Sequence, residues 1–87
     1  MKYFRITLRT RIREKDRELN YDLQQWSGLY QLLDIYTSEL VYSELDAEHY
    51  LLLCLKYDLD RYTVKYFDNI EQLLNDFSSE NSDAGSF

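Results

Sequence analysis

The 87-residue sequence has no proline, two glycines, one histidine and one cysteine, Cys54. A single cysteine excludes an intramolecular disulfide and a zinc site built from cysteines, and it is typical of a reducing compartment. No apolar run approaches the roughly 18 residues of a membrane span. The first residues also carry charge too early for a signal peptide. We therefore expect one soluble, cytoplasmic domain, near the lower size limit for a self-sufficient core.

The net charge of −6 is unevenly distributed along the chain. Residues 1–17 hold seven basic and two acidic side chains, a balance of +5. Residues 18–87 hold three basic and fourteen acidic ones, a balance of −11. An acidic body of this kind repels nucleic acid and attracts basic partners.

The basic charge coincides with a strand pattern at the N-terminus. Because side chains of a strand alternate between two faces, the even positions Phe4, Ile6 and Leu8 predict one apolar face. The opposite, guanidinium face carries Arg5, Arg9, Arg11 and Arg13. We interpret these arginines as an internal counter-charge for the acidic remainder, and nucleic-acid contact is the alternative.

A change of period follows this strand. From Leu19 to Tyr36 apolar residues recur at steps of three and four, which predicts an amphipathic helix of roughly 15–18 residues, capped by Asn20 or Asp22. Gly28 falls inside this span, and a glycine there costs roughly 1 kcal/mol relative to alanine. The glycine therefore predicts a kink or a close contact.

The middle of the chain is ambiguous. Residues 40–42 fit a short strand or a connector. Residues 49–57 form a nearly continuous apolar run that fits a buried strand or a helix beginning near Ser43. Residues 61–67 alternate cleanly, which favours a hairpin of two strands around a short polar turn.

The clearest helix signal follows, with Asp68 as N-cap and Glu71 three residues later. Its apolar stripe consists of Ile70, Leu73, Leu74 and Phe77. Residues 79–87 are small and polar and predict a disordered tail. The sequence thus predicts a single α+β domain over residues 1–78, a βαββα fold whose three-stranded antiparallel sheet carries two helices on one face.

Catalytic and cofactor chemistry has little support. His49 and Cys54 form the only candidate nucleophile pair, and a spacing of five separates them in a strand and in a helix. The Asp58 and Asp60 pair lacks the glycine and distal glutamate of a calcium loop. The two glycines are too far apart to form a phosphate loop. We expect a protein that is not an enzyme and that holds no metal or cofactor.

Acidity and tyrosines together carry the functional interpretation. Nine tyrosines are too many for so small a core, and exposed tyrosine is enriched at interfaces. We expect a protein-binding module that docks an acidic, tyrosine-studded surface onto the basic groove of a larger partner. The candidate contacts are Asp34, Tyr36, Glu39, Tyr42, Glu44, Asp46, Glu48, Asp58 and Asp60.

In size, acidity and lack of catalytic groups the chain is similar to small phage-encoded inhibitors, such as anti-CRISPR and nucleic-acid-mimic proteins. This resemblance lies in composition alone and implies occlusion of a partner's nucleic-acid-binding groove. Two alternatives use other surfaces. One is an RNA- or DNA-binding domain that uses the four arginines of the first strand, and the other is an assembly subunit, such as a homodimer, that pairs through an open sheet edge.

Overall fold

The computed structural model describes the backbone of residues 1–8, 12–35 and 38–85, and the side chains of residues 1–8, 12–33 and 39–80. Its elements in chain order are β1 (Lys2–Leu8), α1 (Glu14–Trp26), β2 (Leu29–Ile35), β3 (Ser38–Leu45), α2 (Ala47–Lys56), the 3-10 turn η1 (Leu59–Arg61), β4 (Thr63–Phe67) and α3 (Ile70–Gly85). The α+β class and the antiparallel sheet are confirmed. The described residues form four strands and three helices, in place of the three strands and two helices expected.

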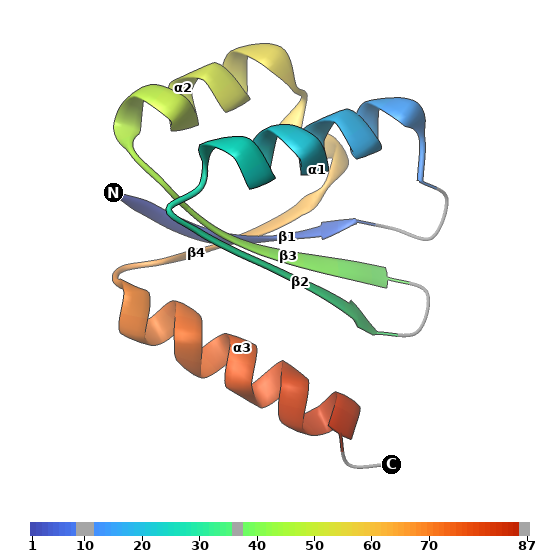
Figure 1. Cartoon of the computed structure of the whole chain (residues 1–87), viewed down its shortest axis with the longest axis vertical. Helices are drawn as coiled ribbons and strands as arrows, with labels where there is room; N and C mark the ends of the chain where they lie inside the picture. The colour runs from blue at the N-terminus through green and yellow to red at the C-terminus, as the bar shows by residue number, and fades with distance from the viewer. Residues whose placement is uncertain (9–11, 36–37, 86–87) are drawn as a thin grey trace.

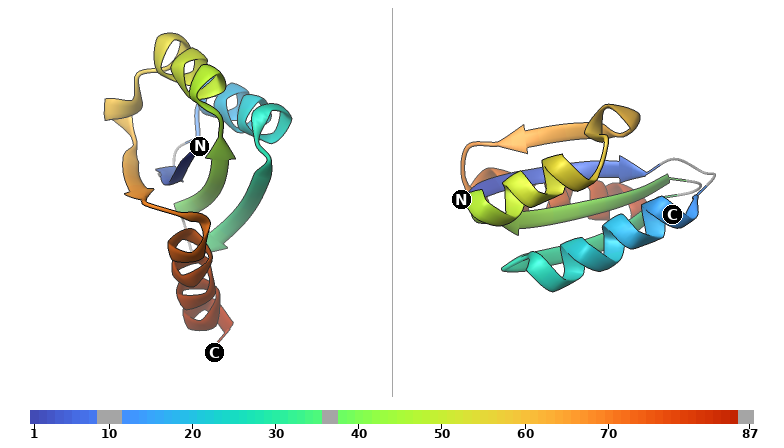
Figure 2. Two further views of the ribbon diagram at one scale, coloured as in Figure 1. Left: turned by 90° about the vertical axis from the view of Figure 1, so that its left-hand side faces the viewer. Right: turned by 90° about the horizontal axis from the view of Figure 1, so that it is seen from above.

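The sheet has the order β2-β3-β1-β4, and every neighbouring pair of strands is antiparallel. Helices α1 and α2 cover one face, and α3 crosses the other face (Figure 1). Figure 2 shows the same three layers from the side, with β2 and β4 as the two outer strands. The prediction that both expected helices lie on one face is therefore wrong.

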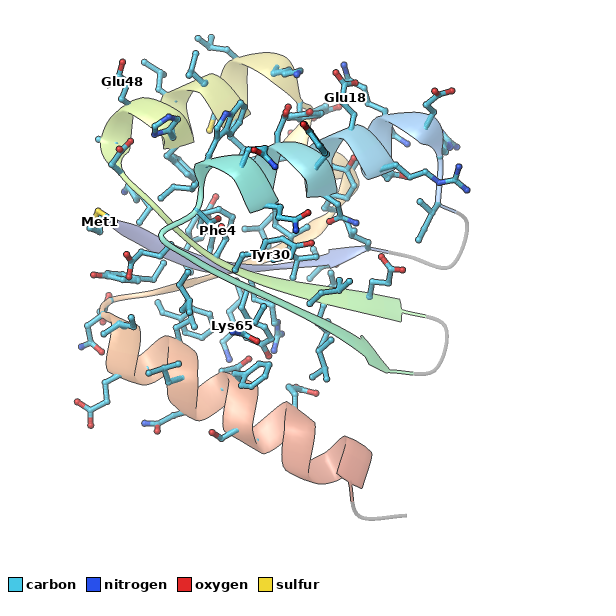
Figure 3. The ribbon with its side chains drawn as sticks, viewed as in Figure 1. Met1, Phe4, Glu18, Tyr30, Glu48 and Lys65 are labelled. Atoms are coloured by element: carbon cyan, nitrogen blue, oxygen red, sulfur yellow. The ribbon has the colours of Figure 1, made fainter. Side chains whose placement is uncertain are left out.

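The alternation of β1 is confirmed, and the two-sided burial of β3 explains the two helical layers. Phe4, Ile6 and Leu8 are buried in the core beneath α1 and α2 (Figure 3). Tyr42 of β3 lies on the opposite face, where it is fully buried with Leu73 of α3 in a second apolar cluster. Because β3 is apolar on both faces, the sheet needs a cover on both sides.

The helix expected from Leu19 to Tyr36 is interrupted. α1 ends at Trp26, and from Leu29 the chain pairs with β3 as β2. Gly28 lies in the turn between them, where its N–H donates to the carbonyl oxygen of Glu44 at 3.0 Å. The apolar pattern after Gly28 fits a helix or a strand equally well, and the long-range pairing with β3 decides for the strand.

The start of α1 also differs from the prediction. The helix begins one turn earlier than expected, with Arg13 as its N-cap. The N–H of Arg13 donates to Oδ2 of Asp16 at 2.8 Å, so Asp16 closes the first turn. Neither Asn20 nor Asp22 is the cap, and Asp22 is buried within α1.

The expected hairpin over residues 49–67 is wrong. Residues 47–56 form α2, and its N-cap is Asp46, whose Oδ1 accepts from the N–H of His49 at 2.8 Å. The partner of β4 is β1, and residues 40–42 belong to the central strand β3. A run that is apolar on all sides has no period of its own, so its capping residue and its neighbours decide its structure.

The structure also differs from the prediction for the C-terminal residues, which were expected to form a disordered tail. The backbone of residues 79–85 continues α3, where the composition predicted a polar tail after residue 78. Residues 86–87 lie outside the described part of the chain.

Candidate functional site

The outward face of α2 carries three exposed leucines. Leu51, Leu52 and Leu55 are 59%, 45% and 75% exposed, whereas Leu53 between them is fully buried. A helix turns by about 100° per residue, so Leu53 points to the sheet while the other three point to solvent. Cys54 is exposed on the same helix. An isolated exposed leucine is ordinary, but three on two adjacent turns form an apolar surface, which we call the leucine face (Leu51, Leu52 and Leu55).

Carboxylates lie at both ends of α2. Asp46 caps the helix and Glu48 occupies its first turn, where Figure 3 shows it directed away from the sheet. Asp58 and Asp60 follow the C-terminal end and are exposed. The leucine face thus lies on a helix with a pair of carboxylates at each end.

The lysine of α2 is already engaged. Lys56 Nζ lies 2.7 Å from Oδ2 of Asp22 and 3.1 Å from Oε1 of Glu18, both on α1. These contacts raise the pKa of Lys56, chiefly through the hydrogen bonds to Asp22 and Glu18. Its charge is therefore compensated within the protein.

The remaining predicted contacts whose side chains the structure describes lie on β3 and not on α2. Glu39 and Glu44 are half-buried at opposite ends of β3. Asp34 occupies the register position opposite Glu39, but its side chain is outside the described set. Tyr36 is outside the described residues altogether. The structure corrects the prediction for Tyr42, since its ring is fully buried under α3 and is not a surface contact.

Three tyrosine–carboxylate pairs join elements that are distant in the sequence. The hydroxyl of Tyr42 donates to Asp76 Oδ2 at 2.7 Å. The other two pairs join Tyr57 to Asp22 and Tyr62 to Asp16. Burial, followed by the bond to the carboxylate, raises the pKa of all three phenols, that of Tyr62 to about 12. These residues hold the helices to their neighbours, so they are structural and are not free for a partner.

Arg5 supports the interpretation of the arginines as an internal counter-charge. Its Nη1 lies 2.6 Å from Oδ2 of Asp76 and 3.4 Å from Oε1 of Glu80, beneath α3. Burial opposes the charged form of Arg5, but its contacts with Tyr42 and Asp76 outweigh this and raise the pKa. Of the other predicted arginines, the exposed Arg13 caps α1, and Arg9 and Arg11 lie outside the described residues.

Three largely buried aspartates make stability depend on pH. Burial alone would raise the pKa of Asp16, Asp22 and Asp76, but hydrogen bonds and nearby cations outweigh it and lower the pKa of each below its ordinary value. A lowered pKa contributes stability above the ordinary pKa that is lost as pH falls through the folded-state value. We expect the free energy of unfolding in urea to decrease progressively below about pH 5. Asp76→Asn should make this decrease shallower, and an unchanged slope would contradict the assignment.

His49, one member of the candidate nucleophile pair, has a structural role. Nδ1 of His49 lies 2.9 Å from Oδ1 of Asp46, and the imidazole ring stacks on Trp26 with a centroid separation of 5.9 Å.

In the part of the chain that the structure describes, no group of three or more His, Cys, Asp or Glu side chains has the geometry of a metal site. Within the same residues, no helix has the length and apolar character that crossing a membrane requires.

Comparison with protein-family models, with curated proteins and with solved structures finds no match that would assign the chain to a family.

The leucine face is the feature that the sequence prediction missed. Its signal was present, because a helix over residues 47–56 carries leucines on more than one side and only one side can face a sheet. The interpretation of residues 49–57 as a strand buried on both faces did not predict an exposed leucine surface.

Proposed function

We propose that this chain is a non-enzymatic protein-binding module that docks through the leucine face of α2. The observation that carries the proposal is the exposure of Leu51, Leu52 and Leu55 beside the fully buried Leu53. Burying a leucine side chain is worth roughly 1.5–3 kcal/mol. This free energy is unused in the isolated domain and is available to a partner that covers the face.

The partner that fits is a basic, apolar segment of a larger protein, such as an amphipathic helix with lysine or arginine at its flanks. Asp46, Glu48, Asp58 and Asp60 at the two ends of α2 would meet these cations, while the leucines meet the apolar stripe. A second copy fits this face less well, since each copy carries a net charge of −6 and Lys56 is already paired. Such docking would occlude a basic surface in the manner of the nucleic-acid-mimic inhibitors.

Two matched peptides test this proposal directly. The probe is a helix-forming peptide of about 18 residues, long enough to be partly helical alone, with leucines at i, i+3, i+4 and i+7 and lysines elsewhere. A control peptide keeps the leucines and replaces lysine with glutamate. We expect fluorescence anisotropy to detect binding of the basic peptide only, with an affinity that falls as salt rises. Equal binding of both peptides, or of neither, would contradict the proposal.

Substitutions on the protein locate the contact. Leu55→Ser should weaken peptide binding roughly tenfold to hundredfold, because the leucine contact is lost. Leu74→Ser, at a leucine of α3 that is 43% exposed, is the matched control and should leave binding unchanged. Glu48→Gln with Asp60→Asn should weaken binding at low salt more than at high salt, and Glu71→Gln on α3 is the charge control. Binding of an oligonucleotide in place of the peptides would instead favour the nucleic-acid alternative.

A further inference from the structure

The outer edge of β4 is open. β4 is the last strand of the order β2-β3-β1-β4, and β1 is its only partner among the described strands. An open edge presents unpaired N–H and C=O groups, and proteins protect such edges with charges, prolines, bulges or a covering element. The sequence of β4, Thr63–Phe67, contains no proline or glycine.

The single charge of β4 does not protect this edge. Nζ of Lys65 lies 3.2 Å from Oδ1 of Asp76, on the α3 side of the sheet (Figure 3). Its charge is therefore balanced within the molecule. On the other face of the sheet, Tyr66 is 53% exposed, and its hydroxyl lies 2.5 Å from that of Tyr50. The edge thus combines high strand propensity, a compensated charge and an exposed aromatic ring.

We propose that two copies of the chain associate through antiparallel pairing of β4 with β4. The register that pairs all five residues of the strand places Lys65 opposite Lys65 of the second copy. The two-fold axis of the dimer passes between these two lysines. Val64 then lies opposite Tyr66 of the second copy, twice by symmetry. Pairs of a β-branched and an aromatic residue are among the stabilising cross-strand neighbours.

Charges at the two ends of β4 favour this antiparallel pairing of identical strands. Arg61 lies just before the strand and Asp68 just after it, and both are exposed. Antiparallel pairing brings Arg61 of one copy near Asp68 of the other at both ends, whereas a parallel pair would align like charges. This local complementarity opposes the general repulsion between two copies of charge −6. Each lysine on the axis pairs with Asp76 of its own copy, a carboxylate that it shares with Arg5.

The dimer would be a continuous eight-stranded sheet with both α2 helices on the same face, since a two-fold axis normal to the sheet preserves its faces. Each dimer would then present two leucine faces, one from each copy. The pairing itself does not depend on the function proposed for α2, so the two proposals succeed or fail separately.

Oxidative cross-linking tests the register. In a Cys54→Ser background, Lys65→Cys places two thiols directly opposite each other, with Cα atoms about 4.5–5.5 Å apart, which a disulfide can span. Thr63→Cys is the matched control, because its two copies would lie about 13 Å apart along the strands. We expect a covalent dimer on a non-reducing gel for Lys65→Cys only. Equal cross-linking of the two variants would overturn the register.

Sedimentation of the unmodified chain tests the association without relying on an engineered cysteine. We expect a dimer to form between about 1 µM and about 1 mM protein. Tyr66→Lys should weaken dimerisation about tenfold, since it removes both Val64–Tyr66 pairs. Leu55→Ser should leave dimerisation unchanged. A monomer over the whole range, or a dimer sensitive to Leu55→Ser and not to Tyr66→Lys, would overturn the proposal.

Discussion

Replacing Leu53 with alanine is expected to lower the free energy of unfolding by about 2–5 kcal/mol, whereas the same change at Leu55 should cost less than about 0.5 kcal/mol. Leu53 is fully buried in the core with Phe4 and Leu23, and truncating it would leave a cavity there. Leu55 is 75% exposed, and truncating it removes little packing. Urea unfolding at neutral pH measures both values.

This pair of variants also discriminates between the two structures considered for residues 49–57. In a strand, residues 53 and 55 lie on the same face and would respond alike. In a helix they are about 200° apart, so one is buried and the other is exposed. Equal losses of stability in the two variants would contradict α2 and restore the hairpin. For a domain of 87 residues, the expected loss at Leu53 is a large part of the total stability.

Asp76→Ala is expected to have the second largest effect, a loss of about 2–4 kcal/mol. Asp76 accepts from the hydroxyl of Tyr42 and pairs with Arg5 and Lys65, so it joins α3 to three strands. Its removal would leave the buried Tyr42 hydroxyl without an acceptor and the largely buried Arg5 with Glu80 as its remaining, more distant counter-charge. Thermal unfolding and urea unfolding should both report the loss.

Two further variants separate the charge of Asp76 from its hydrogen bond. Asp76→Asn keeps an acceptor for Tyr42 but removes the charge, so it should cost roughly half as much as the alanine variant. Glu71→Ala, on the exposed surface of the same helix, should change stability by less than about 0.5 kcal/mol. If Asp76→Ala behaves like Glu71→Ala, then Asp76 does not hold α3 to the sheet.

Part of the fold was predictable because it depends on local pattern. The alternation of Phe4, Ile6 and Leu8 identified both β1 and its buried face. The stripe from Ile70 to Phe77 identified α3 in the same way. In both segments polar and apolar residues have a distinct period, so local sequence and tertiary packing favour the same structure.

Other parts depended on contacts distant in the sequence. Residues 29–35 became a strand because β3 lies beside them, and Leu53 of α2 packs in the core with Phe4 and Leu23, which are far from it in the sequence. The partners of the acidic and tyrosine residues were equally hidden. Tyr57 and Asp22 are 35 residues apart, and Tyr42 and Asp76 are 34 apart, so no local pattern joins them.

By itself, the sequence determined the α+β class, the strand β1, the helix α3 and the strongly acidic balance of residues 18–87, because composition and short-range period carry this information. Only the tertiary structure decided that α3 covers the face of Arg5, that Tyr42 is buried, and that the leucines of α2 face solvent. The physical reason is that a charge or an apolar side chain is compensated or exposed only relative to its spatial neighbours. Those neighbours are set by strand order and helix packing, which an apolar run such as residues 49–57 does not encode locally.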